Sequence, residues 1–148
     1  MTINKVQLFS VPVSDQDRAR DFYVDVLGFE LLADTEMSPD MRWVMVSPPG
    51  AQTALTLVTW FPTMSAGSLK GMVLATDDLQ GDVARLGGLG VVIANGIEEA
   101  AWGRFVQFDD PDGNGIVLQS LFNSRWRSTP KSRSTRPHRS CRVSGWVR

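Results

Sequence analysis

An internal repeat of about 60 residues is the feature that most constrains how this chain can fold. Three short segments of the first half recur in the same order in the second half, at offsets of 61 to 63 residues. The pairs are Val13-Ser14-Asp15 with Thr76-Asp77-Asp78, Arg42-Trp43-Val44 with Arg104-Phe105-Val106, and Leu55-Thr56-Leu57 with Ile116-Val117-Leu118. Ordinary α+β patterning is the alternative explanation, but the shared order and near-constant spacing favour a duplicated module.

The first copy predicts one helix and four strands. Ser14 and Asp15 can cap a helix, because a short polar side chain accepts from the free backbone N–H groups of the first turn. Apolar residues then follow at helical spacing, and Gly28 ends the pattern: Ala19, Phe22, Tyr23, Val26 and Leu27. Runs of apolar and β-branched residues predict strands at 5–13, 29–34, 41–47 and 53–60.

The second copy follows a linker at 61–69 and repeats the same order of elements. Asp77-Asp78 caps a helix with Leu79, Val83 and Leu86 on its apolar face, and a run of glycines ends it. Strands are predicted at 70–76, 90–95, 103–109 and 115–121, with a turn at 110–114. The prediction is an α+β domain over residues 1–122, made of two tandem βαβββ modules, 1–62 and 63–122.

The strands predict two unlike faces, because side chains alternate with a period of two. One face is aliphatic in every strand, for example Val44 and Val46, or Ile116 and Leu118, and should pack on the helix of its module. The other mixes aromatic, small and amide side chains, which is typical of a ligand cavity with apolar walls and few polar groups. A second core or a subunit interface is the alternative interpretation of that face.

Charge and reactive residues divide the chain near residue 122. Residues 1–122 carry 7 basic and 16 acidic residues, whereas residues 123–148 carry 8 basic residues and no acid. His138 and Cys141, the one His and the one Cys, lie in this basic tail, so residues 1–122 can form neither a Ser-His-Asp triad nor a thiolate nucleophile. The tail composition predicts disorder; a weak nucleic-acid-binding arm, a non-native extension and contact with the acidic domain are alternatives.

Two segments resemble the vicinal oxygen chelate superfamily, which includes glyoxalase I, bleomycin-resistance proteins, fosfomycin-resistance proteins and extradiol dioxygenases. They are VPVSDQDRARDFYVDVLGFEL at 11–31, similar to the opening strand and helix of the family, and FDDPDGNGIVLQ at 108–119, similar to its closing turn and strand. The resemblance covers nearly all of 1–121. It implies two βαβββ modules whose curled mixed sheets surround a cavity.

The resemblance also implies four metal-ligand positions, which enzymes of the family fill with His, Glu or Gln. Alignment on the quoted motifs places them at Leu8, Thr56, Gly71 and Val117. Three of these residues have no donor side chain, and a threonine hydroxyl is a weak ligand for zinc or iron. We therefore expect no catalytic metal and no cofactor. Five acidic residues could bind a cation weakly, although surface solvation and turn formation explain them as well: Glu98, Glu99, Asp109, Asp110 and Asp112.

Two classes of function remain open from the sequence. The first is a metal-independent protein that sequesters a planar, often cationic small molecule, as the resemblance to the bleomycin-resistance branch implies. Its expected ligand-binding residues combine the cavity positions with aromatic walls and hydrogen-bonding groups: Leu8, Trp43, Thr56, Trp60, Gly71, Trp102, Phe105, Gln107, Val117 and Gln119. The second is a lyase, isomerase or dioxygenase of the superfamily that uses a buried carboxylate or Tyr23 as acid or base, or Arg42 and Arg104 for an anionic substrate. The alternative interpretations are a core residue with a satisfied hydroxyl for Tyr23 and structural ion pairs at the strand ends for the two arginines.

Partners and location follow from the same features. Members of the family commonly dimerise, so we expect a homodimer in which the second chain closes part of the cavity. The longest uncharged stretch, 43–69, contains three prolines and is not a membrane helix. No secretory signal is evident, which favours the cytoplasm. The acidic domain argues against nucleic acid as a partner.

Overall fold

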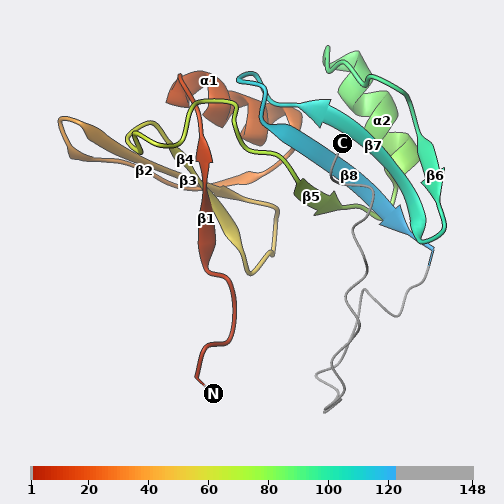
Figure 1. The fold of residues 1–148 in the computed structure, drawn as a ribbon, viewed down its shortest axis with the longest axis horizontal. Helices are drawn as coiled ribbons and strands as arrows, with labels where there is room; N and C mark the ends of the chain where they lie inside the picture. The colour runs from red at the N-terminus through yellow and green to blue at the C-terminus, as the bar shows by residue number, and fades with distance from the viewer. Residues whose placement is uncertain (1, 123–148) are drawn as a thin grey trace.

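Two four-stranded sheets, each with one helical segment, make up the protein in its computed structural model (Figure 1). The structure describes residues 2–122, so the predictions about the basic tail, His138 and Cys141 lie outside the described residues. Sheet A contains β1 (Leu8–Pro12), β2 (Glu30–Ser38), β3 (Met41–Ser47) and β4 (Ala54–Val58). Sheet B contains β5 (Met72–Ala75), β6 (Glu98–Ala100), β7 (Gly103–Asp109) and β8 (Gly115–Leu121).

The two sheets have the same topology. Their strand orders are β1-β4-β3-β2 and β5-β8-β7-β6, and neither sheet closes into a barrel. The first strand of each module pairs in parallel with the last one, with Leu8 opposite Ala54 in sheet A and Met72 opposite Ile116 in sheet B. All other strand pairs are antiparallel. The predicted tandem βαβββ modules and the α+β class are therefore confirmed.

The first helix begins and ends where the sequence predicts. In α1 (Gln16–Asp21), the side chain of Asp15 accepts a hydrogen bond from the backbone N–H of Arg18. The helix continues as a wider π-type turn, η1 (Phe22–Val26), and stops before Gly28, whose φ of 79° is a left-handed conformation that glycine adopts without strain.

The second helix, α2 (Leu79–Gly88), is also confirmed, with Asp78 accepting from the N–H of Gly81. The strand predicted at 90–95 is wrong, because this segment is irregular and the strand of the sheet edge lies at Glu98–Ala100. Val91 and Ile93 mimic strand alternation because both pack against the core. None of the helices in residues 2–122 is long and apolar enough to cross a membrane.

The aliphatic faces of both sheets pack on the helices, as predicted. α1 contacts β3 and β4, and α2 contacts β7 and β8. The buried side chains form one core that joins both modules, including Val44, Val46, Leu55, Leu57, Val106, Phe108, Ile116 and Leu118 from the strands and Ala19, Tyr23, Leu79 and Leu86 from the helical segments. We call this side of each sheet its helix-facing side and the opposite side its outer face.

A buried polar cluster also holds the modules together. The hydroxyl of Tyr23 donates to Asp110 Oδ2 over 3.0 Å, which links the first helical segment to the turn before β8. Asn114 Nδ2 donates to the carbonyl of Pro12 over 2.8 Å and to Asp110 Oδ2 over 2.7 Å, while its Oδ1 accepts from the N–H of Leu69. We call Tyr23, Asp110 and Asn114 the inter-module cluster. The DPDGN segment, residues 110–114, therefore connects the two modules through hydrogen bonds in addition to forming a turn.

Candidate functional site

The outer face of sheet A presents a stacked tryptophan pair beside a buried hydroxyl. The rings of Trp43 and Trp60 lie 6.2 Å apart with an interplanar angle of 26°. Thr56 lies on the same face, between Ser10 of β1 and Met45 of β3, and is fully buried. Its Oγ1 has no hydrogen-bond partner among residues 2–122. A buried hydroxyl without a partner is costly, which distinguishes Thr56 from the apolar residues around it.

The outer face of sheet B presents a second aromatic pair together with amide side chains. Trp102, which precedes β7, stacks on Phe105 with ring centroids 5.4 Å apart and an interplanar angle of 23°. Phe105 lies directly opposite Gln119, and Gln107 lies opposite Val117. Trp102 remains 40% exposed. Five predicted residues of the second module are thus brought together on one surface: Trp102, Phe105, Gln107, Val117 and Gln119.

The four positions equivalent to metal ligands do not fit a metal. Leu8, Thr56 and Val117 lie on the outer faces of β1, β4 and β8, as the alignment predicts. Gly71 lies just before β5 with a φ of 83° and offers no side chain. In the described part of the chain, no group of three or more His, Cys, Asp or Glu residues is placed to hold a metal ion.

Within residues 2–122, the core joins the helix-facing sides of the two sheets rather than their outer faces. The shared core is built from helix-facing side chains, and the buried outer-face residues Val58 and Val117 are not part of it. A cavity of about 470 Å³ is lined by residues of both modules, mainly helix-facing strand residues and helix residues such as Phe9, Leu55, Met72 and Leu86, together with Val73 and Ala75 of β5. A second cavity, of about 550 Å³, contains Gln107 but none of the other predicted site residues. The ten predicted residues therefore form two separate surfaces, apart from Gly71 at the margin.

Tyr23 is committed to the inter-module cluster rather than available as an acid or base. Burial, followed by the charge of the neighbouring Asp110, raises the pKa of its phenol far above the ordinary value. The hydroxyl therefore stays protonated and continues to donate to Asp110. This agrees with the interpretation of Tyr23 as a core residue with a satisfied hydroxyl.

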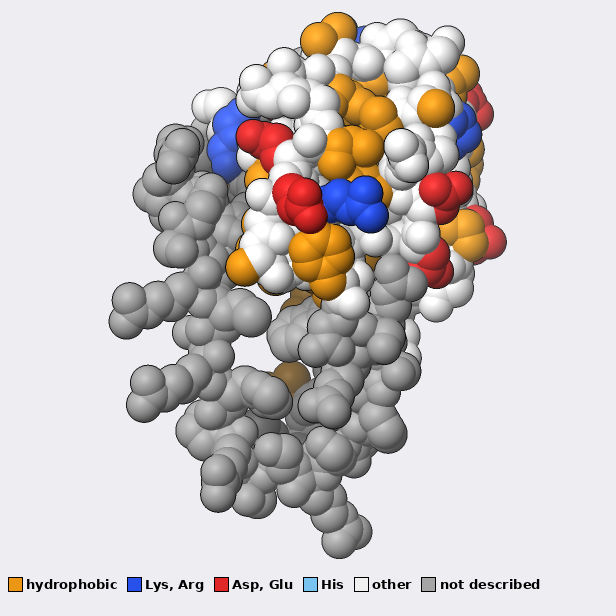
Figure 2. Space-filling model, turned by 90° about the vertical axis from the view of Figure 1, so that its right-hand side faces the viewer, with side chains coloured by type: hydrophobic (Ala, Val, Ile, Leu, Met, Phe, Trp, Pro, Cys, Tyr) orange, Lys and Arg blue, Asp and Glu red, His pale blue; other side chains and the backbone are white. Residues whose placement is uncertain are grey.

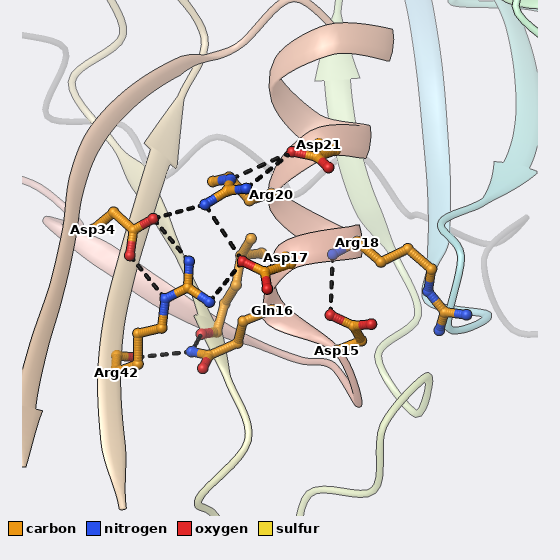
Figure 3. A network of polar contacts seen from close by, with 9 residues as sticks. Asp15, Gln16, Asp17, Arg18, Arg20, Asp21, Asp34 and Arg42 are labelled. Carbon is orange, nitrogen blue, oxygen red and sulfur yellow. Dashed lines mark hydrogen bonds and ion pairs between the residues drawn. The ribbon is translucent and has the colours of Figure 1, made fainter. Parts of the chain in front are cut away.

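Arg42 belongs to an ion-pair network on the helix-facing side of sheet A (Figure 3). Its guanidinium donates to both oxygens of Asp34, each over 2.8 Å, and pairs with Asp17. Arg20 also pairs with Asp34, over 2.9 Å. The hydrogen bond from Arg42 lowers the pKa of Asp34 to about 2. Arg42 is thus engaged on the side opposite the aromatic pair, as expected for a structural ion pair.

Sequence reasoning missed two features of the site scaffold. Gln16 Nε2 donates to the carbonyl of Arg42 over 2.7 Å and to that of Leu57 over 2.8 Å, which fixes α1 on β3 and β4. Asn114 was interpreted only as part of a turn, yet it is fully buried. The resemblance of DPDGN to the family motif was the one signal that pointed to more than turn formation.

The acidic balance of residues 1–122 does not produce a uniformly acidic surface on the side shown in Figure 2. On that side, acidic, basic and apolar side chains are interspersed. Local charge at the outer faces, rather than net charge alone, therefore determines which ligand charge is favoured.

Comparisons with known proteins agree with this geometry. The family model described as the Glyoxalase/Bleomycin resistance protein/Dioxygenase superfamily matches residues 3–118. The crystal structure of TnmS3, an antibiotic binding protein from Streptomyces sp. CB03234, is 54% identical, covers 82% of this chain and 98% of its own, and has a TM-score of 0.78. A glyoxalase/bleomycin resistance protein from the same organism is 53% identical, covers 78% and 99%, and has a TM-score of 0.71. YetH of Bacillus subtilis strain 168, described as uncharacterized, is 31% identical over 79% of this chain and 98% of its own.

Proposed function

We propose that this protein binds and sequesters a small organic molecule without a metal. The proposal proceeds from its family, because the chain belongs to the glyoxalase/bleomycin resistance protein/dioxygenase superfamily. One observation carries the proposal. Each module presents a stacked aromatic pair on an outer face that the core does not use. Flat rings offer a large apolar contact area to a planar ligand at little entropic cost.

The polar groups of the two faces would orient the ligand. Thr56 contributes a buried hydroxyl without a partner, and Gln107 and Gln119 contribute amides beside Phe105. Such groups can donate to or accept from carbonyl, hydroxyl and amide groups of an organic molecule. The similarity to TnmS3, which is an antibiotic binding protein, supports a small molecule as the ligand.

We further propose that the protein acts as a homodimer in the cytoplasm. Sheet A of one chain would face sheet B of its partner, so that the Trp43–Trp60 pair and the Trp102–Phe105 pair form opposite walls of one site. This arrangement is supported by the aromatic pairs, which lie outside the core of residues 2–122: Trp102 is exposed, and Trp43, Trp60 and Phe105 are half-buried. Light scattering after size exclusion should give twice the mass of one chain, and a monomer at working concentration would contradict the proposal.

An enzyme of the same superfamily is the alternative, and two of its sequence candidates, Tyr23 and Arg42, have other partners in the structure. Tyr23 is hydrogen-bonded to Asp110, and Arg42 is paired with Asp34 and Asp17. Neither side chain is placed among the aromatic residues of an outer face.

A thermal-shift screen of small planar molecules tests the proposal, because a ligand that binds only the folded state raises the melting temperature. Trp43→Ala should abolish most of the increase in melting temperature produced by a ligand found in the screen. Phe9→Ala is the matched control, because Phe9 is also a partly exposed aromatic residue of sheet A but lies on the opposite side of β1. Stoichiometric tightly bound metal together with turnover of the hit would contradict a sequestering role.

A further inference from the structure

Two adjacent glutamates on β6 lie on opposite sides of sheet B. Glu98 is directly opposite Phe105 of β7, and Glu99 is directly opposite Arg104. Residues that are directly opposite in an antiparallel pair share a face, and their Cβ atoms lie about 5 Å apart. Glu98 therefore belongs to the outer face, beside the aromatic pair, whereas Glu99 belongs to the helix-facing side.

Within residues 2–122, no positively charged group pairs with the carboxylate of Glu98. Glu98 is half-buried, yet among residues 2–122 it makes no side-chain hydrogen bond and no ion pair. Its cross-strand neighbour on β7, Phe105, stacks on Trp102 and lies opposite the neutral Gln119 of β8. A half-buried carboxylate beside aromatic rings is thus available to a ligand.

The other end of the same face differs. Asp109 lies on the outer face opposite Gly115, at the far end of β7 from Glu98. The side-chain carbons of Lys70 pass over Gly115 there, and the Lys70 ammonium donates to the carbonyl of Gly113 over 2.7 Å. Among residues 2–122, Glu98 is therefore the acidic residue of this face that lies next to the aromatic pair, at the end of β7 away from Lys70.

We propose that Glu98 selects, at the site proposed above, a planar aromatic ligand that carries one organic cation. The inference rests on the proposed function, because it assumes that Trp102 and Phe105 contact the ligand. A cation over an aromatic face is attracted by the ring, and a nearby carboxylate adds an ion pair. The overall negative charge of residues 1–122 would increase the rate of encounter but would not orient the ligand.

Two fused-ring probes of similar size separate the contribution of charge from that of stacking. 9-Aminoacridine is a cation at neutral pH, and acridone is neutral. Fluorescence titration of the full-length protein should show that Glu98→Gln weakens binding of 9-aminoacridine about fivefold and leaves acridone binding unchanged. Glu99→Gln is the matched control, because it removes the same charge from the adjacent residue on the opposite side of the sheet; it should change neither affinity by more than about 1.5-fold.

The outcomes distinguish this inference from the proposed function. Equal effects of Glu98→Gln and Glu99→Gln on the cation would overturn the role of Glu98 and leave small-molecule binding intact, provided that Phe105→Ala weakens both probes. Binding of either probe that is insensitive to Phe105→Ala, or no binding of either, would overturn the proposed site and this inference together. Circular dichroism of each variant confirms that it is folded before titration.

Discussion

The two modules are alike in the side chains that pack in the core and differ in the charged and polar side chains outside it. Their buried helix-facing strand residues are aliphatic or aromatic in both sheets and lie in one core. At the repeated Arg-aromatic-Val segment, however, Arg42 is held by Asp34 and Asp17, whereas Arg104 makes no ion pair in residues 2–122. The outer face of sheet A is uncharged around Thr56, while that of sheet B carries amides and Glu98.

This difference indicates two kinds of constraint on a duplicated module. Helix-facing residues are constrained by packing, which is the same problem in each copy and has a similar solution. Outer-face residues have no such common requirement, so they can diverge between the copies; in the proposed dimer they would contact opposite sides of one ligand. The following changes test that division, beginning with the largest expected effect.

Leu57→Ala should lower the free energy of unfolding by about 3 kcal/mol, because it leaves a cavity in the core. Leu57 is fully buried on the helix-facing side of β4. Thr56→Val, at the adjacent residue on the outer face, should change stability by no more than about 1 kcal/mol in either direction, because the lost hydroxyl has no partner. Urea denaturation measures both; similar losses for the two variants would break the distinction between the faces.

Asn114→Ala should lower the free energy of unfolding by about 2 kcal/mol, because it leaves the carbonyl of Pro12 and the carboxylate of Asp110 short of a donor. The matched control is Asn95→Ala, at an exposed position of an irregular segment, which should cost less than about 0.5 kcal/mol. Urea denaturation measures the free energy of unfolding of both variants. Equal stability of the two variants would contradict the role of the inter-module cluster.

Phe105→Ala and Trp43→Ala should each weaken ligand binding about tenfold, which corresponds to about 1.4 kcal/mol. Both aromatic side chains are only partly buried, so stability should fall less than it does for Leu57→Ala. Isothermal titration with a hit from the screen measures the affinities. If only one of the two variants weakens binding, the ligand contacts one module and the proposed two-walled site is wrong.

The ion pair of Arg42 with Asp34 should contribute about 0.5–1 kcal/mol in a double-mutant cycle, because both side chains retain some solvent contact. Since the folded-state pKa of Asp34 is lowered from 3.8 to about 2, its contribution is fully present above about pH 4 and is lost as the pH falls through 2. Arg104→Ala, at the equivalent position of the second module, should change stability by less than about 0.5 kcal/mol. A coupling energy that stays constant down to pH 2 would contradict the network.

Much of the fold was predictable from local patterns, because caps, glycine stops and strand alternation are encoded by neighbouring residues. The capping roles of Asp15 and Asp78 and the division between Leu57 and Thr56 are examples. The position of β6 was not predictable in this way, since Val91 imitates a strand residue while packing from an irregular segment. Without that strand, the face on which Glu98 lies could not be assigned.

The relation between the two modules was also beyond the sequence patterns. It depends on long-range hydrogen bonds, such as that from Asn114 to Pro12, which no local periodicity reveals. The two aromatic pairs were predicted residue by residue, but their separation on faces outside a common core emerged only from the structure.

A mixing experiment with two damaged chains tests the central claim, a site shared between two copies, most directly. Trp43→Ala damages sheet A and Phe105→Ala damages sheet B, so each homodimer would have two impaired sites. If each site combines sheet A of one chain with sheet B of the other, a mixed dimer contains one intact site and one doubly impaired site. Titration of the re-equilibrated mixture should therefore recover high-affinity binding in about a quarter of the sites, because about half of the dimers are mixed. No recovery in a mixture shown to contain mixed dimers would contradict the shared site.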